Sequence, residues 1–272
     1  MIRVTTSILL LLIFSLRPAT AQSRSVGAYG QVPGFEQVLV PFDTATIPGQ
    51  FGTRWSAELW VRNDAERPVN LFPERCSFIG LEGPCPKRID VPGNTTTLLD
   101  VLAFTYGDRA PGVLLYIPQD RIGDIYFNLR IRDLSKQLES AGTEVPIVRE
   151  AELRTGRTTL LNVPLKAGSR ANLRVYSPDL FGARFVVRVY RQSTDELLVD
   201  RAFSEGFPTD PPFPPLVPAT FDFSAALHDA GFAGGGGVRV VIEPIRPGGT
   251  RFWPLLGITD NVTQEVTFIT PQ

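Results

Sequence analysis

The chain has 272 residues, enough for more than one domain of ordinary size. Its 27 lysines and arginines nearly balance its 28 aspartates and glutamates, so the formal net charge is −1. A chain of this charge has no overall field to recruit nucleic acid or an anionic membrane surface, and neither is an expected partner.

The first 21 residues predict a cleaved export signal. Arg3 precedes an apolar run over 8–16, and Ala19–Ala21 fits a cleavage site of small residues. The apolar run is about half the length needed to cross a bilayer. We therefore expect a mature chain that begins near Gln22, lies in the periplasm or outside the cell, and inserts no segment into the membrane.

Apolar and polar residues alternate with a period of two over most of the remaining chain, which is typical of antiparallel strands with one wet face. In the first half, the strand-like segments are 36–42, 54–63, 76–80, 95–102, 112–117, 123–133 and 143–149. In the second half, they are 158–164, 170–177, 183–191, 196–203, 218–223, 237–243, 251–258 and 263–269. The spacing predicts an all-β chain of two tandem immunoglobulin-like antiparallel β-sandwich domains, at 22–150 and 151–272.

The two halves also share a loose repeat that keeps its order along the chain. The matched segments are 38–42 with 161–165, 59–61 with 173–175, 126–131 with 252–258, and 144–145 with 265–266. A repeat of this length indicates two like domains, because the units of a solenoid are shorter.

Alternation points Trp60 out of its sheet. If its two neighbours face the core, Trp60 lies on the outer face together with Arg54 and Arg62. An outward Trp can stack on a sugar ring or anchor a partner, and the alternative is that a neighbouring domain or an Arg covers it. These three residues are the candidate binding surface. The same two alternatives, binding or cover by a neighbour, apply to Trp253 in the second half.

The chain carries no recognisable catalytic constellation, so no enzyme activity, cofactor or metal is predicted. A histidine-dependent nucleophile would have to use His228, the single histidine, which lies in a short polar turn. The sequence contains neither the Gly-x-Ser-x-Gly elbow nor a phosphate-binding glycine loop before a helix. A calcium ion held by turn oxygens is the alternative that stays open.

Three segments of the second half, Arg170–Val175, Val186–Tyr190 and Ile258–Thr263, are followed by the closing Thr267–Pro271. Through them, and above all through an Asp-Asn-x-Thr turn, this half resembles a module of secreted bacterial proteins of unassigned function. The resemblance implies a β-sandwich for display or adhesion and brings no catalytic residue with it. Segment Leu59–Val69 is similar to a strand–turn–strand of pilus chaperones, which donate an edge strand to their partners.

Together these observations favour a non-enzymatic exported protein that binds a protein or a glycan, as a cell-surface or extracellular adhesion or structural module. One alternative is a carbohydrate-binding module that uses Trp60 and neighbouring aromatic residues. The other is a periplasmic protein similar to pilus chaperones.

Cys76 and Cys85 are the two cysteines, and a close pair in an exported chain predicts a disulfide. In the chain-entropy model, closing so short a loop stabilises the fold by about 2.5–3 kcal/mol. We expect both thiols of the native protein to resist alkylation until a reductant is added. Changing both to Ser should lower the free energy of unfolding in urea by that amount. Equal alkylation with and without reductant would contradict the disulfide.

Overall fold

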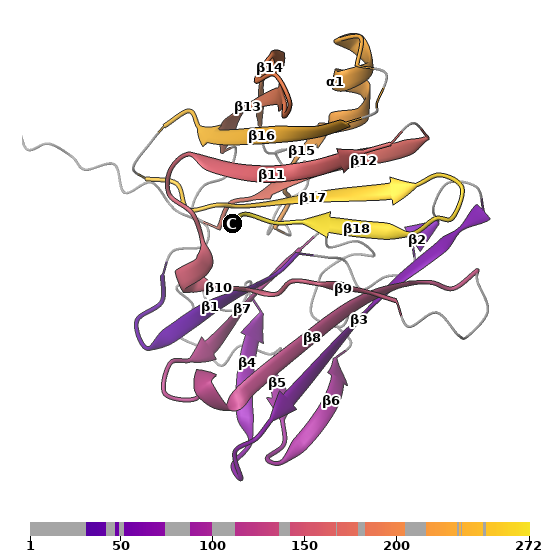
Figure 1. Ribbon diagram of the computed structural model, residues 1–272. Coiled ribbons are helices and arrows are strands. Elements are labelled where there is room, and N and C mark those ends of the chain that lie inside the picture. The colour runs from indigo at the N-terminus through magenta and orange to yellow at the C-terminus, as the bar shows by residue number, and fades with distance from the viewer. Residues whose placement is uncertain are drawn as a thin grey trace, which may run out of the picture.

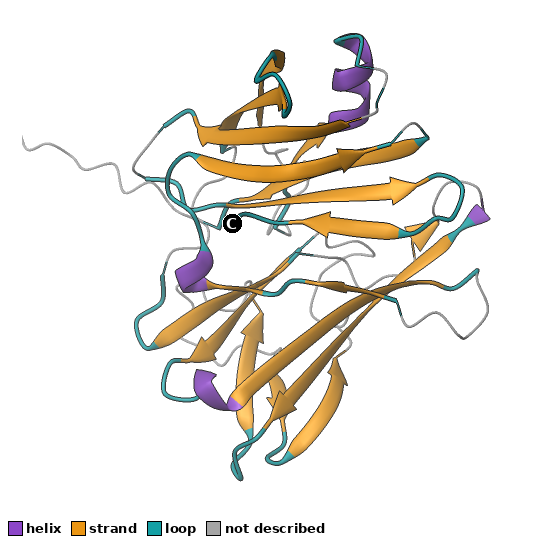
Figure 2. Ribbon diagram, in the orientation of Figure 1, coloured by secondary structure: helices purple, strands orange, loops and turns teal. Residues whose placement is uncertain are grey.

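The computed structural model describes residues 31–41, 47–48, 52–73, 88–99, 112–135, 142–166, 168–178, 183–204, 216–232, 234, 236–246 and 249–272. The predicted export signal, the two cysteines at 76 and 85, and the expected strand at 76–80 lie outside the described residues. The described residues form two stacked β-sandwiches (Figures 1 and 2).

The first sandwich contains two antiparallel sheets. Its strands are β1 (Phe35–Val40), β2 (Ile47–Pro48), β3 (Arg54–Asn63), β4 (Val69–Pro73), β5 (Ile89–Val91), β6 (Thr95–Leu99), β7 (Val113–Pro118), β8 (Ile125–Asp133), β9 (Thr143–Val145) and β10 (Val148–Arg149). One sheet has the order β10-β1-β7-β4-β5, and the other has the order β2-β3-β8-β9 with β6 paired to β3. Short 3-10 turns at Ile122–Asp124 and Glu150–Glu152 precede β8 and follow β10.

The second sandwich repeats this arrangement. Its strands are β11 (Thr158–Leu165), β12 (Ser169–Tyr176), β13 (Arg184–Arg191), β14 (Leu197–Ser204), β15 (Ala219–Asp222), β16 (Gly236–Pro244), β17 (Trp253–Asp260) and β18 (Val266–Ile269). The sheets have the orders β11-β16-β13-β14 and β15-β12-β17-β18. A short helix, α1 (Phe223–Asp229), follows β15 and is capped by Asp222, whose Oδ1 accepts a hydrogen bond from the Ala225 backbone 2.9 Å away.

The prediction of an all-β chain with two tandem antiparallel sandwiches is confirmed. Most expected strands agree with the structure to within a few residues at each end. Three short strands, β2, β4 and β5, were missed because so few residues alternate in each. The strand order also departs from the constant-type immunoglobulin order, in which the first two strands share a sheet. Here β11 and β12 belong to different sheets.

The internal repeat corresponds to a duplicated topology. Strands β1, β3, β4, β5, β6, β7, β8 and β9 take the places of β11, β12, β13, β14, β15, β16, β17 and β18. The register agrees as well: Leu59 pairs with Leu129 in the first sandwich, and their counterparts Leu173 and Leu256 pair in the second. The match at the end of each half is looser. The repeat aligns segment 144–145 with 265–266, but the residue paired with Leu256 is Ile269, three positions after 266.

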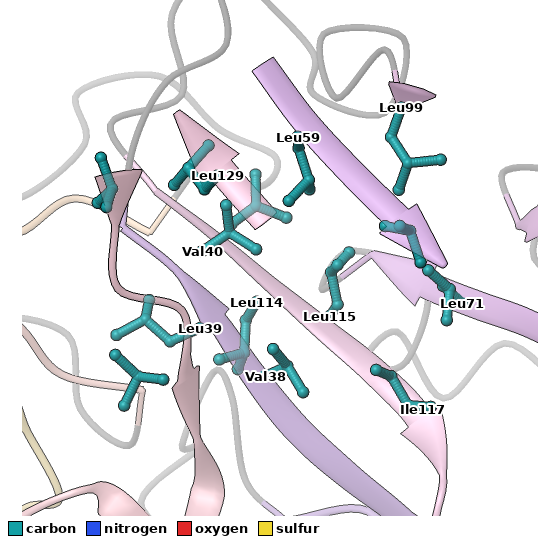
Figure 3. Packing of buried hydrophobic residues seen from close by; sticks show 14 of the residues in the cluster. Val38, Leu39, Val40, Leu59, Leu71, Leu99, Leu114, Leu115, Ile117 and Leu129 are labelled. Atoms are coloured by element: carbon teal, nitrogen blue, oxygen red, sulfur yellow. The ribbon is translucent and has the colours of Figure 1, made fainter. Parts of the chain in front are cut away.

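The core lies on the inward side of the strands, as the alternation of apolar and polar residues predicted. Leu59 of β3 and Leu129 of β8 are fully buried and face Val38 and Val40 of β1 across the first sandwich (Figure 3). A second cluster lies between the sheets of the other sandwich. The second cluster stabilises its own sandwich, whereas the first also extends into the contact between the two sandwiches.

The two sandwiches pack face to face through one sheet of each. On β1 and β7, the residues that point away from the first core are also buried, among them Leu39 and Leu114. They cluster with Tyr176, Trp253 and Leu255, which point outward from β12 and β17. The interface therefore joins the outer face of the β10-β1-β7-β4-β5 sheet to that of the β15-β12-β17-β18 sheet.

Four polar side chains at the same interface bond to one another. The Arg251 guanidinium binds Oε1 of Glu150 and donates to Oε1 of Gln37, each at 2.8 Å. Gln37 donates from its backbone to Glu150 at 3.1 Å and from its side chain to the Tyr116 hydroxyl at 3.0 Å. Because the buried amide has partners for donor and acceptor, it adds specificity to the packing without an unsatisfied group.

Tyr176 closes the interface beside Gly112. Its hydroxyl donates to the Pro41 carbonyl, and a Cβ at Gly112 would lie only 2.8 Å from the ring. Burial raises the pKa of Tyr176 above its ordinary value, against the opposing effect of the Arg174 charge. The phenol is therefore held in its neutral form in the folded protein.

This raised pKa predicts a pH dependence at alkaline pH. The stabilising contribution is fully present below the pKa of an unfolded tyrosine, about 10, and is lost as the pH rises above it. Tyr176→Phe should lower the free energy of unfolding by about 1 kcal/mol at neutral pH, because the Pro41 carbonyl loses its donor. The difference between the two proteins in urea unfolding should shrink above about pH 10. A difference that does not change with pH would contradict the shift.

Candidate binding surface

Strand β3 projects Trp60 away from the core, as the alternation predicted. Ala57, Leu59 and Val61 are buried in the first sandwich, whereas the Trp60 side chain between them is 38% exposed. The second sandwich packs mainly on the outer face of the other sheet, at β1 and β7, and only β9 at the edge of this sheet approaches β18. The neighbouring sandwich therefore does not cover Trp60.

Strand pairing surrounds Trp60 with further apolar area. Leu98 of β6 lies directly opposite it and is 48% exposed. On the other side Asn128 of β8 is opposite, and Tyr126, two residues away along β8, is 57% exposed. Diagonal neighbours on paired strands are close enough for aromatic side chains to share one surface. We call the outward side of β6, β3 and β8, centred on Trp60, Leu98 and Tyr126, the Trp60 face.

Several charges on the Trp60 face are paired within it or at its border. Glu58 forms an ion pair with Arg132 of β8. Arg62 binds Asp64 at 2.6 Å and donates to the Asn94 carbonyl at 2.9 Å. The apolar centre is thus bordered by charges that already have partners. A ligand that covers it would leave none of these charges buried without a partner.

Of the three predicted residues, the structure brings two together. Arg62 shares the outer face with Trp60, two positions along the strand, although its guanidinium is committed to the adjoining turn. Arg54 begins β3, six residues from Trp60, which along an extended strand is about 20 Å. It therefore borders a different part of the sheet.

Sequence reasoning missed Leu98 and Tyr126 as members of the surface. The alternation of the segment 123–133 already pointed Tyr126 outward. What the sequence did not contain was the pairing of β3 with both β6 and β8, which joins residues far apart in the chain.

The equivalent surface in the second sandwich is buried. By register, Trp60 corresponds to Arg174 and Tyr126 to Trp253, which is only 5% exposed in the interface with the first sandwich. The two outcomes expected for an outward Trp are thus divided between the halves: Trp253 is covered by the neighbouring sandwich and Trp60 is open.

A hollow of about 580 Å³ lies beside the junction of the sandwiches and is lined in part by Gln31, Glu36 and Glu150. Both carboxylates in it are held by arginines. Glu36 binds Arg149 at 2.6 Å, and Glu150 binds Arg251 in the interface network. Their positions are those of structural ion pairs that fix the junction.

The remaining groups singled out in the sequence lie elsewhere. His228 is on α1 and is almost fully exposed. Among the residues that the structure describes, no group of three or more His, Cys, Asp or Glu side chains is arranged to hold a metal ion. No helix in the described ranges is long and apolar enough to cross a membrane.

Comparison of the chain with protein-family models, with curated proteins and with solved structures finds no match. The suggested relation to secreted bacterial modules and to pilus chaperones therefore stays a prediction.

The different settings of the two tryptophans predict different costs of truncation. Trp253→Ala should lower the free energy of unfolding by about 3–5 kcal/mol, because it leaves a cavity between the sandwiches. Trp60→Ala should lower it by less than about 1 kcal/mol, because the side chain is largely outside the core. Urea unfolding of both variants checks this. A cost for Trp60→Ala as large as that for Trp253→Ala would show that Trp60 is a structural residue.

Proposed function

We propose that this chain is an exported, non-enzymatic binding protein that acts at the cell surface or outside the cell through its Trp60 face. One observation carries the proposal: the sheet face that the second sandwich buries against the first is left open in the first sandwich, and it displays a Trp and a Tyr. A face of this kind, left unpaired, marks an interaction surface.

The chemistry of the face suits binding. Tryptophan and tyrosine carry much of the energy of protein interfaces, because each offers a large rigid apolar body with a polar tip. Here they are bordered by arginines and an asparagine that can form the polar rim of an interface. The flat sheet beneath holds their positions, so little conformational entropy is lost on binding.

A carbohydrate is the second candidate for the ligand. Trp60 and Tyr126 project from neighbouring strands of one flat face, and each offers a ring on which a sugar could stack. Asn128 and Arg130 lie beside them and could hydrogen-bond to hydroxyl groups. This arrangement favours an extended glycan over a small molecule, because the described face is open rather than a deep pocket.

The proposal is tested with protein isolated from the envelope or medium of the cells that make it, where an N-terminus at Gln22 checks export. The fluorescently labelled protein should bind saturably to the surface of those cells. Trp60→Ala combined with Tyr126→Ala should weaken binding about tenfold or more, which is the size expected for two anchoring aromatic residues.

Val262→Ala provides the matched control, because Val262 is an almost fully exposed apolar residue in the turn before β18. It should bind like the natural protein. Equal binding by all three proteins, or by none, would refute a role for the Trp60 face. Retention of the natural protein, but not the double variant, on immobilised polysaccharides would select the carbohydrate candidate.

A further inference from the structure

We infer that the Trp60 face docks a second copy of this chain, which contributes the outer face of its β11-β16-β13-β14 sheet, so that copies join head to tail. The inference rests on the proposed function, because it names the partner of the same face. It follows from the duplicated fold and from the one contact between sandwiches that the chain already makes.

The open face and the buried face are built alike. The shared register makes Arg62 equivalent to Tyr176 and Tyr126 equivalent to Trp253. On the same two strands, therefore, the first sandwich displays a Trp and a Tyr outward, at 60 and 126, and the second also has a Trp and a Tyr, at 253 and 176. The second pair is fully used in packing, whereas the first is not.

The structure contains one example of what covers such a face. Tyr176 and Trp253 are buried by the outer face of the β10-β1-β7-β4-β5 sheet, with Leu39 and Leu114 at its centre. The occupant is the outer sheet face of another β-sandwich, so the contact is one of sheet on sheet. A sugar chain or an extended peptide would not reproduce that contact.

The counterpart of this covering face is open in part, although Val241 of β16 on the same side is fully buried. In the second sandwich, β11 and β16 take the places of β1 and β7, and Val163 pairs with Val238 as Val40 pairs with Val113. The outward side of their sheet carries Leu161, which is 42% exposed. Val186 and Tyr190 of β13 add half-buried apolar area to the same sheet.

Several charges of this second face are also paired within it. Arg188 binds Glu243 at 2.7 Å and Asp200 at 3.3 Å. The Arg239 guanidinium lies 4.2 Å from the centre of the Tyr190 ring and forms an ion pair with Asp195. The ion pairs described on both faces can be covered without separating their charges, which lowers the cost of docking.

The symmetry of the contact follows from these two faces. Each copy offers one face of each kind, and the two kinds differ, so the contact is heterologous. A heterologous contact that does not close into a ring adds copies without limit. The expected product is a linear assembly whose length grows with protein concentration.

Sedimentation velocity of the purified exported protein over a wide concentration range tests the inference. The weight-average mass should rise with concentration beyond that of a dimer. Trp60→Ala with Tyr126→Ala should weaken association about tenfold or more, and Leu161→Glu on the opposite face should do the same. Val262→Ala should assemble like the natural protein. All four proteins should unfold at similar urea concentrations, since the changed side chains are exposed.

Mixing the two defective proteins gives the sharpest result. The Trp60-face variant keeps its β11-β16-β13-β14 face and the Leu161→Glu variant keeps its Trp60 face, so an equal mixture should form dimers and nothing longer. Dimers of the natural protein that survive Leu161→Glu would show that two Trp60 faces meet each other, which overturns the head-to-tail contact. A protein that stays monomeric but binds cells or polysaccharides through Trp60 would overturn self-docking and leave the proposed function standing. A monomer that binds neither would refute both.

Discussion

The pair of strands β1 and β7 is buried on both faces, and the arrangement of the whole molecule depends on this. One side of the pair closes the core of the first sandwich, and the other receives Tyr176 and Trp253 from the second. A sheet that is dry on both sides cannot tolerate an unpaired polar group. The one amide on it, Gln37, is accordingly tied to Arg251, Glu150 and Tyr116. The second sandwich is thereby fixed in position as well as attached.

Much of the fold was predictable from the sequence because period-two alternation is a local property. It gave the strands, their inward residues and the outward direction of Trp60. Whether the other sandwich covers an outward sheet face is not a local property, however. Trp60 and Trp253 both point outward from their strands, and only the stacking of the sandwiches leaves one open and buries the other. For the same reason, Arg54 was put in the candidate binding surface because it shares a strand face with Trp60. Tyr126, which lies close to Trp60 only through strand pairing, was left out.

The duplication shows how equivalent positions acquire different roles. Leu59 and Leu173 remain interchangeable, because each faces a core of the same kind. Their outward neighbours Trp60 and Arg174 are not, because one lies in water and the other beside the partner sandwich. The scaffold constrains inward positions strongly and outward positions weakly, so the two halves diverged mainly on their faces. The resulting molecule has one shared internal contact and two unlike external faces.

Strand β11 differs from its counterpart β1 in a way that has a further consequence. Strand β10 covers the outer edge of β1, whereas among the described strands β11 pairs only with β16 and ends its sheet. Along β11 the register shifts between Leu160 and Val163, Asn162 has a φ of +50°, and Pro164 has no amide hydrogen. A bulged strand with a proline cannot offer the regular row of donors and acceptors that a foreign strand would need. This margin of the protein is closed to strand donation, so a partner that approaches here meets side chains and not backbone.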